Sequence, residues 1–212
     1  MTSDLVQSVH LWPVDIPITD PFVVATGARI IAQNMFVRVT LENGSCGYGE
    51  AAPFPEVGGE DRATCMEVAT KLASSLLGQS AGGYEQVAAT LRRAAPANPA
   101  ARCGLETALV DAHCRSRGIP QWALWGSADV RERETDITIP ICDADKTLAL
   151  ARAWHARGFR QFKMKIGHDV EEDIRRLRLV HQALRDVAFI GDGNQGYSRE
   201  ECLAFAQGVK RF

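Results

Sequence analysis

The sequence lacks the features that mark a membrane protein or a nucleic-acid-binding protein. No apolar run approaches the roughly 18 residues that cross a bilayer, and the N-terminus has no basic region followed by an apolar stretch. With 24 Lys and Arg against 26 Asp and Glu, the chain has no basic excess for binding nucleic acid. We therefore expect no membrane partner and no nucleic-acid partner, and we expect the protein to be cytoplasmic.

The sequence also lacks a cysteine or histidine motif. Its six cysteines show no C-x-x-C spacing, which favours reduced, mostly buried thiols over a disulfide framework or a zinc site. Its five histidines show no H-x-x-x-H spacing, so they are not expected to bind metal. With 46% hydrophobic and 24% charged residues, the composition is typical of a globular protein.

The first part of the chain predicts an α+β unit in which a three-stranded meander is followed by helices. Asn43-Gly44 supplies a tight hairpin turn, and Pro13 and Pro17 limit the first strand to the edge of the sheet. The strands are expected at 5–18, 34–41 and 46–52, the loops at 19–30 and 52–60, and the helices at 61–77, 83–94 and 99–117.

From residue 135 the chain alternates strand and helix. The strands are expected at 137–142, 160–166 and 187–192, and the helices at 145–157, at 170–185 and from 198 onward. The last two helices begin with capping-box patterns, Asp169 with Glu172 and Ser198 with Glu201. The helix over 170–185 has one apolar stripe, formed by Val170, Ile174, Leu177, Val180 and Leu184. Such repeated βα units predict a parallel sheet with right-handed crossovers. A closed (β/α) barrel needs eight units and roughly 250 residues, so three units would be only its first part. We therefore expect a fragment of a longer polypeptide, or half of a split one.

Two lysines lie where a buried strand should carry only packing residues. Side chains alternate along a strand, so Lys163 and Lys165 share one face while Phe162 and Met164 share the other. In a barrel the apolar set would meet the helices, which leaves both lysines pointing inward. Two neighbouring ammonium groups repel each other, which favours the neutral form that a general base requires. The alternative is a solvated pair at a sheet edge.

Asp192 ends the next strand and has the parity of two interior-type positions, Ala188 and Ile190. A carboxylate beside a lysine indicates either a structural ion pair or a ligand for a hard cation. Asn194 adds a second polar group directed the same way, which favours a site.

The glycines of 191–196 formally match the dinucleotide-binding fingerprint G-x-G-x-x-G. Asp192 would place a carboxylate inside the phosphate-binding turn, which argues against that function. An NAD-binding oxidoreductase nevertheless remains an alternative from another class, as does a non-catalytic remnant.

The order of these features resembles the enolase superfamily, specifically the muconate lactonizing enzyme subgroup of the mandelate racemase/muconate lactonizing enzyme family, and most closely its dipeptide epimerases. The motifs that carry the resemblance are P-F-V-V-A-T-G at 21–27, G-Y-G-E-A-A-P at 47–53, K-M-K at 163–165 and D-G-N-Q-G-Y at 192–197. The resemblance implies an α+β capping domain over 1–125, followed by a partial TIM-type (β/α) barrel over 126–212.

The resemblance also implies roles for individual residues. Lys165 would be one of two acid/base lysines beside the substrate's α-carbon, with Lys163 tuning it. Asp192 would be the first of three carboxylate ligands to Mg²⁺, with Asn194 as a neighbour of that site. Thr138 would contact the substrate.

Two loops, around Thr26 and over 53–59, would close over the substrate, with Thr26 as a substrate-binding residue. The other metal ligands and the opposing lysine would lie on strands that this chain does not contain.

The implied activity is that of an isomerase, a Mg²⁺-dependent epimerase or racemase. It would abstract the proton α to a carboxylate through an enediolate. The expected substrate is a small carboxylate, a dipeptide or an N-acylamino acid, and the full-length protein would be a homo-oligomer. Muconate cycloisomerisation and o-succinylbenzoate synthesis are alternatives within the same subgroup. The isolated chain is expected to be inactive.

Overall fold

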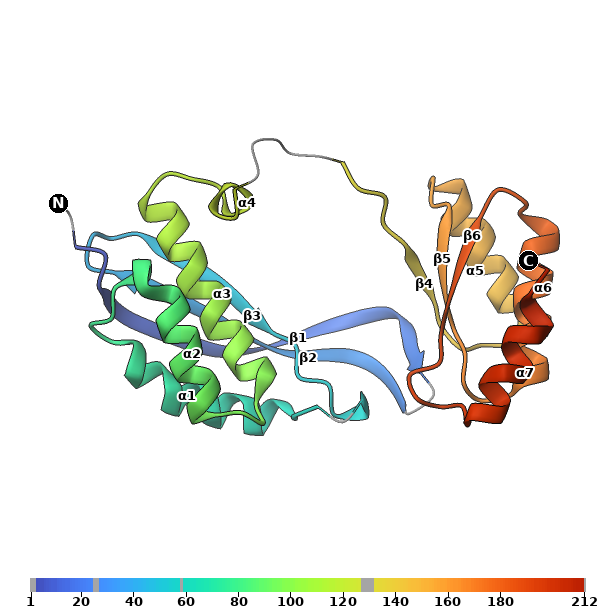
Figure 1. Ribbon diagram of the computed structural model, residues 1–212, viewed down its shortest axis with the longest axis horizontal. Helices are drawn as coiled ribbons and strands as arrows, with labels where there is room; N and C mark the ends of the chain where they lie inside the picture. The colour runs from blue at the N-terminus through green and yellow to red at the C-terminus, as the bar shows by residue number, and fades with distance from the viewer. Residues whose placement is uncertain (1–2, 25–26, 58, 127–131, 212) are drawn as a thin grey trace. The chain divides into compact units, whose positions relative to one another are not determined.

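The computed structural model describes residues 3–24, 27–57, 59–126 and 132–211 (Figure 1). Its internal contacts divide the chain into a first unit, residues 1–17 and 31–131, and a second unit, residues 18–30 and 132–212. In the part of the chain described, no helix has the length and apolar character that crossing a membrane requires.

The first unit contains most of a three-stranded sheet in the order β1-β2-β3, whose residues 18–24 and 27–30 are grouped with the second unit. Its strands are β1 (Val6–Val24), β2 (Gly27–Leu41) and β3 (Cys46–Ala51). β2 and β3 pair antiparallel across the predicted hairpin turn, where Gly44 has a φ of 84°. β1 lies at the edge of the sheet, which confirms the position predicted from its prolines.

The predicted loop over 19–30 is wrong, because β1 continues to Val24 and β2 already begins at Gly27. Ile18, Thr19 and Ile30 are β-branched residues that favour strands. Pro17 and Pro21 do not end β1, because the missing N–H of a proline is tolerated on an edge strand.

Three helices cover one face of this sheet, and their bounds lie within one residue of those predicted (Figure 1). They are α1 (Arg62–Leu76), α2 (Tyr84–Ala94) and α3 (Pro99–Ser116). Three short turns were not predicted, namely η1 (Pro55–Val57), η2 (Ala81–Gly83) and α4 (Gln121–Leu124). The core lies between β2 and the helices, with Val37 and Val39 of β2 and Leu105 of α3 fully buried.

From residue 132 on, the second unit forms three βα units, as predicted, with a parallel sheet in the order β4-β5-β6. The strands are β4 (Ile137–Ile139), β5 (Gln161–Lys165) and β6 (Ala188–Asp192), and the helices are α5 (Ala144–Ala156), α6 (Val170–Ala183) and α7 (Arg199–Val209). β4 ends three residues before the predicted position, just before Pro140, which cannot donate a ladder hydrogen bond.

The helices of the second unit lie against one face of its sheet (Figure 1). Phe162 and Met164 of β5 are fully buried in the core that these helices cover, together with Leu177 and Val180 of α6. On the opposite face, Ile190 is 44% exposed. Lys163 and Thr138 lie on the same face as Ile190, because the three residues pair across the strands.

The prediction that the cysteines are mostly buried is wrong. All six thiols are free, but only Cys65 and Cys114 are buried, while Cys103 and Cys202 are exposed. The two exposed thiols lie on the outer sides of α3 and α7, since a helix presents only part of its surface to the core.

Candidate active site

The strand register brings the predicted polar residues onto one face of the second sheet. Lys165 pairs with Asp192 across β5 and β6, and Lys163 pairs with Thr138 across β5 and β4. Paired residues of neighbouring strands point to the same side of a sheet. The side chains of Thr138, Lys163, Lys165 and Asp192 therefore share the face opposite the helices.

Both lysines converge on one carboxylate oxygen. Lys165 Nζ lies 2.8 Å from Asp192 Oδ2, and Lys163 Nζ lies 3.0 Å from the same atom. Lys165 Nζ also donates to Asn194 Oδ1 at 2.7 Å. The side chain of Lys165 is 7% exposed and that of Lys163 is 33% exposed. Lys165 is thus enclosed and oriented, whereas Lys163 is open to solvent.

The loop after β6 reaches back toward Lys165 through an unusual backbone conformation. Asn194 and Gln195 have φ values of 43° and 65°, in the left-handed region that is costly for residues other than glycine. The backbone N–H of Asn194 donates to Asp192 Oδ1 at 3.1 Å, and the N–H of Gly196 donates to Gly193 O at 2.7 Å. Parity along an extended strand predicted the direction of Asn194, but this tight turn is what brings its amide to Lys165.

The carboxyl of Asp192 is held in its ionised form. Burial raises its pKa, but hydrogen bonds from Lys165 and Lys163, and from the N–H of Asn194, outweigh that effect and lower the pKa from 3.8 to about 2. Near neutral pH the cluster therefore contains a carboxylate.

The low pKa of Asp192 predicts a loss of stability in acid. Because the folded-state pKa lies below the unfolded value, the stabilisation is complete above about pH 4 and is lost as the pH falls toward about 2. We expect it to amount to about 1–2 kcal/mol. Urea unfolding of wild type and Asp192→Asn should show that difference at pH 6 and a much smaller one at pH 2. An equal difference at both pH values would contradict the assignment.

Sequence reasoning missed a buried polar network behind these strands. Arg176 and Asp173, both on α6, are 1% and 2% exposed and form an ion pair of 2.9 Å. Tyr197, on the loop after β6, donates to Asp173 Oδ2 at 2.6 Å, and burial and the Asp173 carboxylate raise the pKa of its phenol. The sequence did indicate that these two residues face the core. Asp173 and Arg176 each lie four residues before a residue of the apolar stripe of α6, and residues four apart lie on the same side of a helix.

The structure places Thr138 half-buried on β4, beside Lys163. Thr26 lies outside the described residues, so its predicted role stays a prediction.

The cluster offers oxygen ligands of the kind that Mg²⁺ prefers, the Asp192 carboxylate and the Asn194 amide. Among the described residues, however, no group of three or more His, Cys, Asp or Glu side chains could hold a metal ion. The donor chemistry fits Mg²⁺, but the number of donors does not make a complete site.

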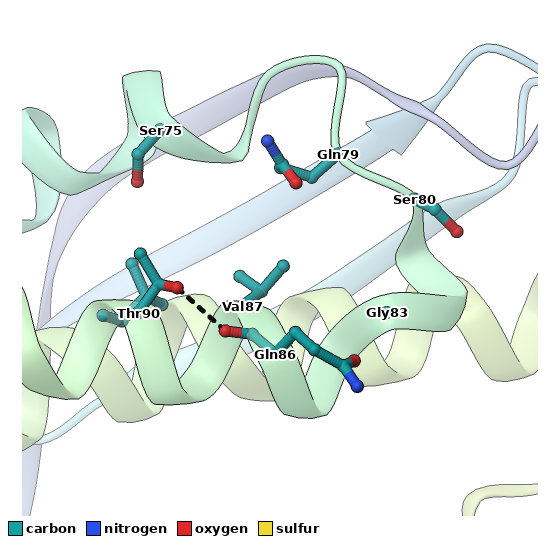
Figure 2. Close-up of a pocket in the computed structure, with 8 residues that line it drawn as sticks. Ser75, Gln79, Ser80, Gly83, Gln86, Val87 and Thr90 are labelled. Carbon is teal, nitrogen blue, oxygen red and sulfur yellow. Dashed lines mark hydrogen bonds between the residues drawn. The ribbon is translucent and has the colours of Figure 1, made fainter.

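A separate hollow of about 270 Å³ lies in the first unit between the end of α1, the η2 turn and α2 (Figure 2). Its lining residues are Ser75, Gln79, Ser80, Gly83, Gln86, Val87, Thr90 and Leu91. None of them carries a charge, and Thr90 Oγ1 is already bonded to the carbonyl of Gln86. This hollow therefore offers no acid/base group.

Comparison with known proteins matches both units. Residues 7–126 match the family model described as mandelate racemase/muconate lactonizing enzyme, N-terminal domain, and residues 146–212 match the model described as enolase C-terminal domain-like. Neither is a dinucleotide-binding model.

The similar proteins include epimerases. The chain is 40% identical over 206 residues to an aromatic dipeptide epimerase of Herpetosiphon aurantiacus, covering 97% of this chain and 58% of that protein. It is 36% identical over 203 residues to a hydrophobic dipeptide epimerase of Citrifermentans bemidjiense, covering 92% of this chain and 55% of that protein.

A solved structure shares the fold. The dipeptide epimerase of Cytophaga hutchinsonii, complexed with Mg and the dipeptide D-Ala-L-Val, superimposes with a TM-score of 0.92 at 27% identity over 97% of this chain and 56% of that one. The chain thus spans a little over half the length of the proteins it matches. Its two matched domains and its relatives agree, and the chain belongs to the mandelate racemase/muconate lactonizing enzyme family of the enolase superfamily.

Proposed function

We propose that this chain supplies one acid/base side and one metal ligand of a Mg²⁺-dependent isomerase that epimerises dipeptides. One observation carries the proposal. The enclosed ammonium of Lys165 is held between Asp192 and Asn194 at the carboxyl ends of parallel strands, where (β/α) barrels place their catalytic residues. The relatives named as dipeptide epimerases support the reaction class.

Each residue has a proposed part. Lys165, in its neutral form, takes the α-proton at Nζ, and its bonds to Asp192 and Asn194 orient that atom. Lys163 keeps a second positive charge 3.0 Å from Asp192, and it is proposed to tune the electrostatic surroundings of Lys165. Thr138 and Thr26 are proposed to contact the substrate.

Asp192 is proposed as a Mg²⁺ ligand, with Asn194 beside the site. When bound, Mg²⁺ supplies positive charge that stabilises the charge developing on the substrate carboxylate as the α-proton leaves. The structure of a relative complexed with Mg supports this proposal.

The proposal predicts weak metal binding by the 212-residue chain. Mg²⁺ prefers six oxygen ligands in near-octahedral geometry, and one carboxylate with one amide falls short of that. Calorimetric titration should show no saturation below about 1 mM Mg²⁺. The same chain should be inactive toward dipeptides. Micromolar binding, or turnover by this chain alone, would contradict the prediction.

The function is tested by hydrogen exchange at the substrate's α-carbon in the whole protein. Dipeptides with an aromatic or aliphatic residue are incubated in deuterated water, and the α-proton signal is followed by NMR. We expect exchange and epimer formation that stop when EDTA removes the metal. If no dipeptide exchanges while a muconate or o-succinylbenzoate precursor turns over, one of the alternative reactions of the subgroup is favoured instead.

Experiments on the same whole protein also test the two alternatives from other functional classes, an oxidoreductase and a non-catalytic remnant. Tight binding of NADH, followed by its fluorescence, would favour an oxidoreductase. Absence of both metal binding and exchange in the whole protein would favour a non-catalytic remnant. The homo-oligomeric state and the cytoplasmic location remain proposals, and sedimentation of the whole protein tests the first of them.

A further inference from the structure

Arg176 is the largest fully buried side chain among the described residues, with 1% of it exposed. A guanidinium is costly to bury unless its N–H groups and its charge are matched. Arg176 lies on the helix side of the strands that carry the candidate active site, so the partners of its guanidinium bear on how those strands are held.

The guanidinium of Arg176 joins the carboxyl ends of two strands. Pairing between β4 and β5 ends at Ile139 and Met164, and the next residue on β4, Pro140, has no N–H with which to extend the ladder. Arg176 donates instead to the carbonyls that come next on each strand, from Nη2 to Pro140 O at 2.7 Å and from Nη1 to Lys165 O at 3.0 Å. It therefore fixes the backbone of Lys165 from the helix side.

Two further bonds of Arg176 complete its environment. Nε donates to Thr147 Oγ1 at 3.0 Å, and Nη1 donates to Asp173 Oδ1 at 2.9 Å. The planar guanidinium is suited to this task, since its donors point in fixed directions, unlike those of a lysine ammonium.

Asp173 extends the network to the third strand. Its Oδ2 accepts from the N–H of Gly167 at 2.9 Å and from the hydroxyl of Tyr197 at 2.6 Å. Gly167, with a φ of 118°, belongs to the turn after β5, and Tyr197 follows Asp192 by five residues on the loop after β6. The left-handed residues Asn194 and Gln195 lie between Asp192 and Tyr197 on the loop after β6. A strained turn of this kind persists only where the surrounding structure holds it in place.

We propose that Arg176, Asp173 and Tyr197 are positioning residues that tie the ends of β4 and β5 to the loop after β6, and so hold Lys165 Nζ between Asp192 and Asn194. The inference rests on the proposed function for its catalytic consequence. Its structural part is independent of that function.

The test uses Tyr197→Phe in the whole protein, because this change keeps the ring that packs on Phe205 at 5.8 Å and removes only the hydroxyl. Loss of the bond to Asp173 should free the loop while the fold persists. We expect amide hydrogen exchange at residues 193–197 and at Gly167 to rise about tenfold, with the amides of the β5 core unchanged.

In the same variant kcat should fall about tenfold to a hundredfold while KM changes little, because a misplaced base affects the chemical step more than binding. Val180→Ala is the matched control, since it removes packing from the same helix with no polar link to the strands. The control should lower Tm and raise exchange evenly over the second unit, with no additional rise at residues 193–197 or Gly167, and kcat should stay as in wild type.

Two outcomes would overturn the proposal. One is an unchanged exchange pattern in Tyr197→Phe. The other is a uniform rise over the second unit like that expected of any destabilised core variant. If the wild-type protein exchanges no substrate α-proton, the proposed function fails, while the amide-exchange comparison still decides the structural role.

Discussion

Replacing Lys165 with alanine in the whole protein is expected to lower α-proton exchange of a dipeptide by about a thousandfold or more. A positioned general base contributes roughly 10²–10⁴-fold to a rate, and Lys165 is the enclosed amine whose Nζ lies 2.7 Å from Asn194 and 2.8 Å from Asp192. The proton would have no acceptor at that place. Exchange is followed by NMR in deuterated water, with saturating Mg²⁺.

The fold should survive this change, because Lys163 remains 3.0 Å from Asp192 and still balances the carboxylate. Lys163→Ala is the informative comparison, since that side chain is 33% exposed and is proposed only to tune its neighbour. We expect a smaller loss there, about tenfold to a hundredfold. Lys71→Ala, at an exposed ion pair on α1, is the control for loss of a lysine as such. Exchange that persists at the wild-type rate in Lys165→Ala would refute the role assigned to it.

Replacing Gly49 with valine is expected to destabilise the first unit strongly, by about 3 kcal/mol or more. A Cβ at Gly49 would lie 2.1 Å from the carbonyl oxygen of Gly104, and one at Gly47 would lie 2.1 Å from the backbone nitrogen of Ala112. These distances are far below van der Waals contact and involve the backbone of α3, which cannot turn aside as a side chain can. Overpacking a core costs about 1–3 kcal/mol and occasionally more, and a clash with backbone belongs at the upper end.

The measurement is urea unfolding monitored by circular dichroism, with Gly49→Ala as a milder version of the same clash. Gly83→Ala is the matched control, because its φ of −87° suits any residue and the nearest atom, Gln86 Oε1, lies 3.8 Å from the added Cβ. It should lower stability by no more than about 1 kcal/mol, because alanine is a poorer N-cap than glycine at the start of α2. A Gly49→Val protein as stable as wild type would mean that α3 does not approach β3 so closely.

Sequence patterns were sufficient for most of the architecture. The stripe of α6 and the alternation of β5 both follow from the rule that apolar side chains leave water. The capping box predicted at the start of α7 is confirmed, because the side chains of Ser198 and Glu201 each accept a hydrogen bond from the other residue's backbone N–H. At Asp169 only half of the expected box forms, because the carboxylate of Glu172 pairs with Arg175 instead.

The limits of sequence reasoning lay where tertiary surroundings overrule local preference. Residues 19–24 and 27–30 lie in strands, and Pro21 does not prevent this because β1 is an edge strand. The sequence did predict which strand residues face the site. Side chains alternate along a strand with a period of two, which places Lys163 and Lys165 on one face whatever their neighbours are.

What the sequence determined by itself is therefore the order of the elements, the face on which each strand residue points, and the presence of two lysines and a carboxylate at strand ends. Only the tertiary structure decided that both ammonium groups meet at Asp192 Oδ2, that a left-handed turn returns Asn194 to Lys165, and that Arg176 is buried while Arg175 is exposed. The physical reason is that periodicity depends on backbone geometry within one element. The pairing of charges depends instead on strand register and on which groups the packed elements remove from water.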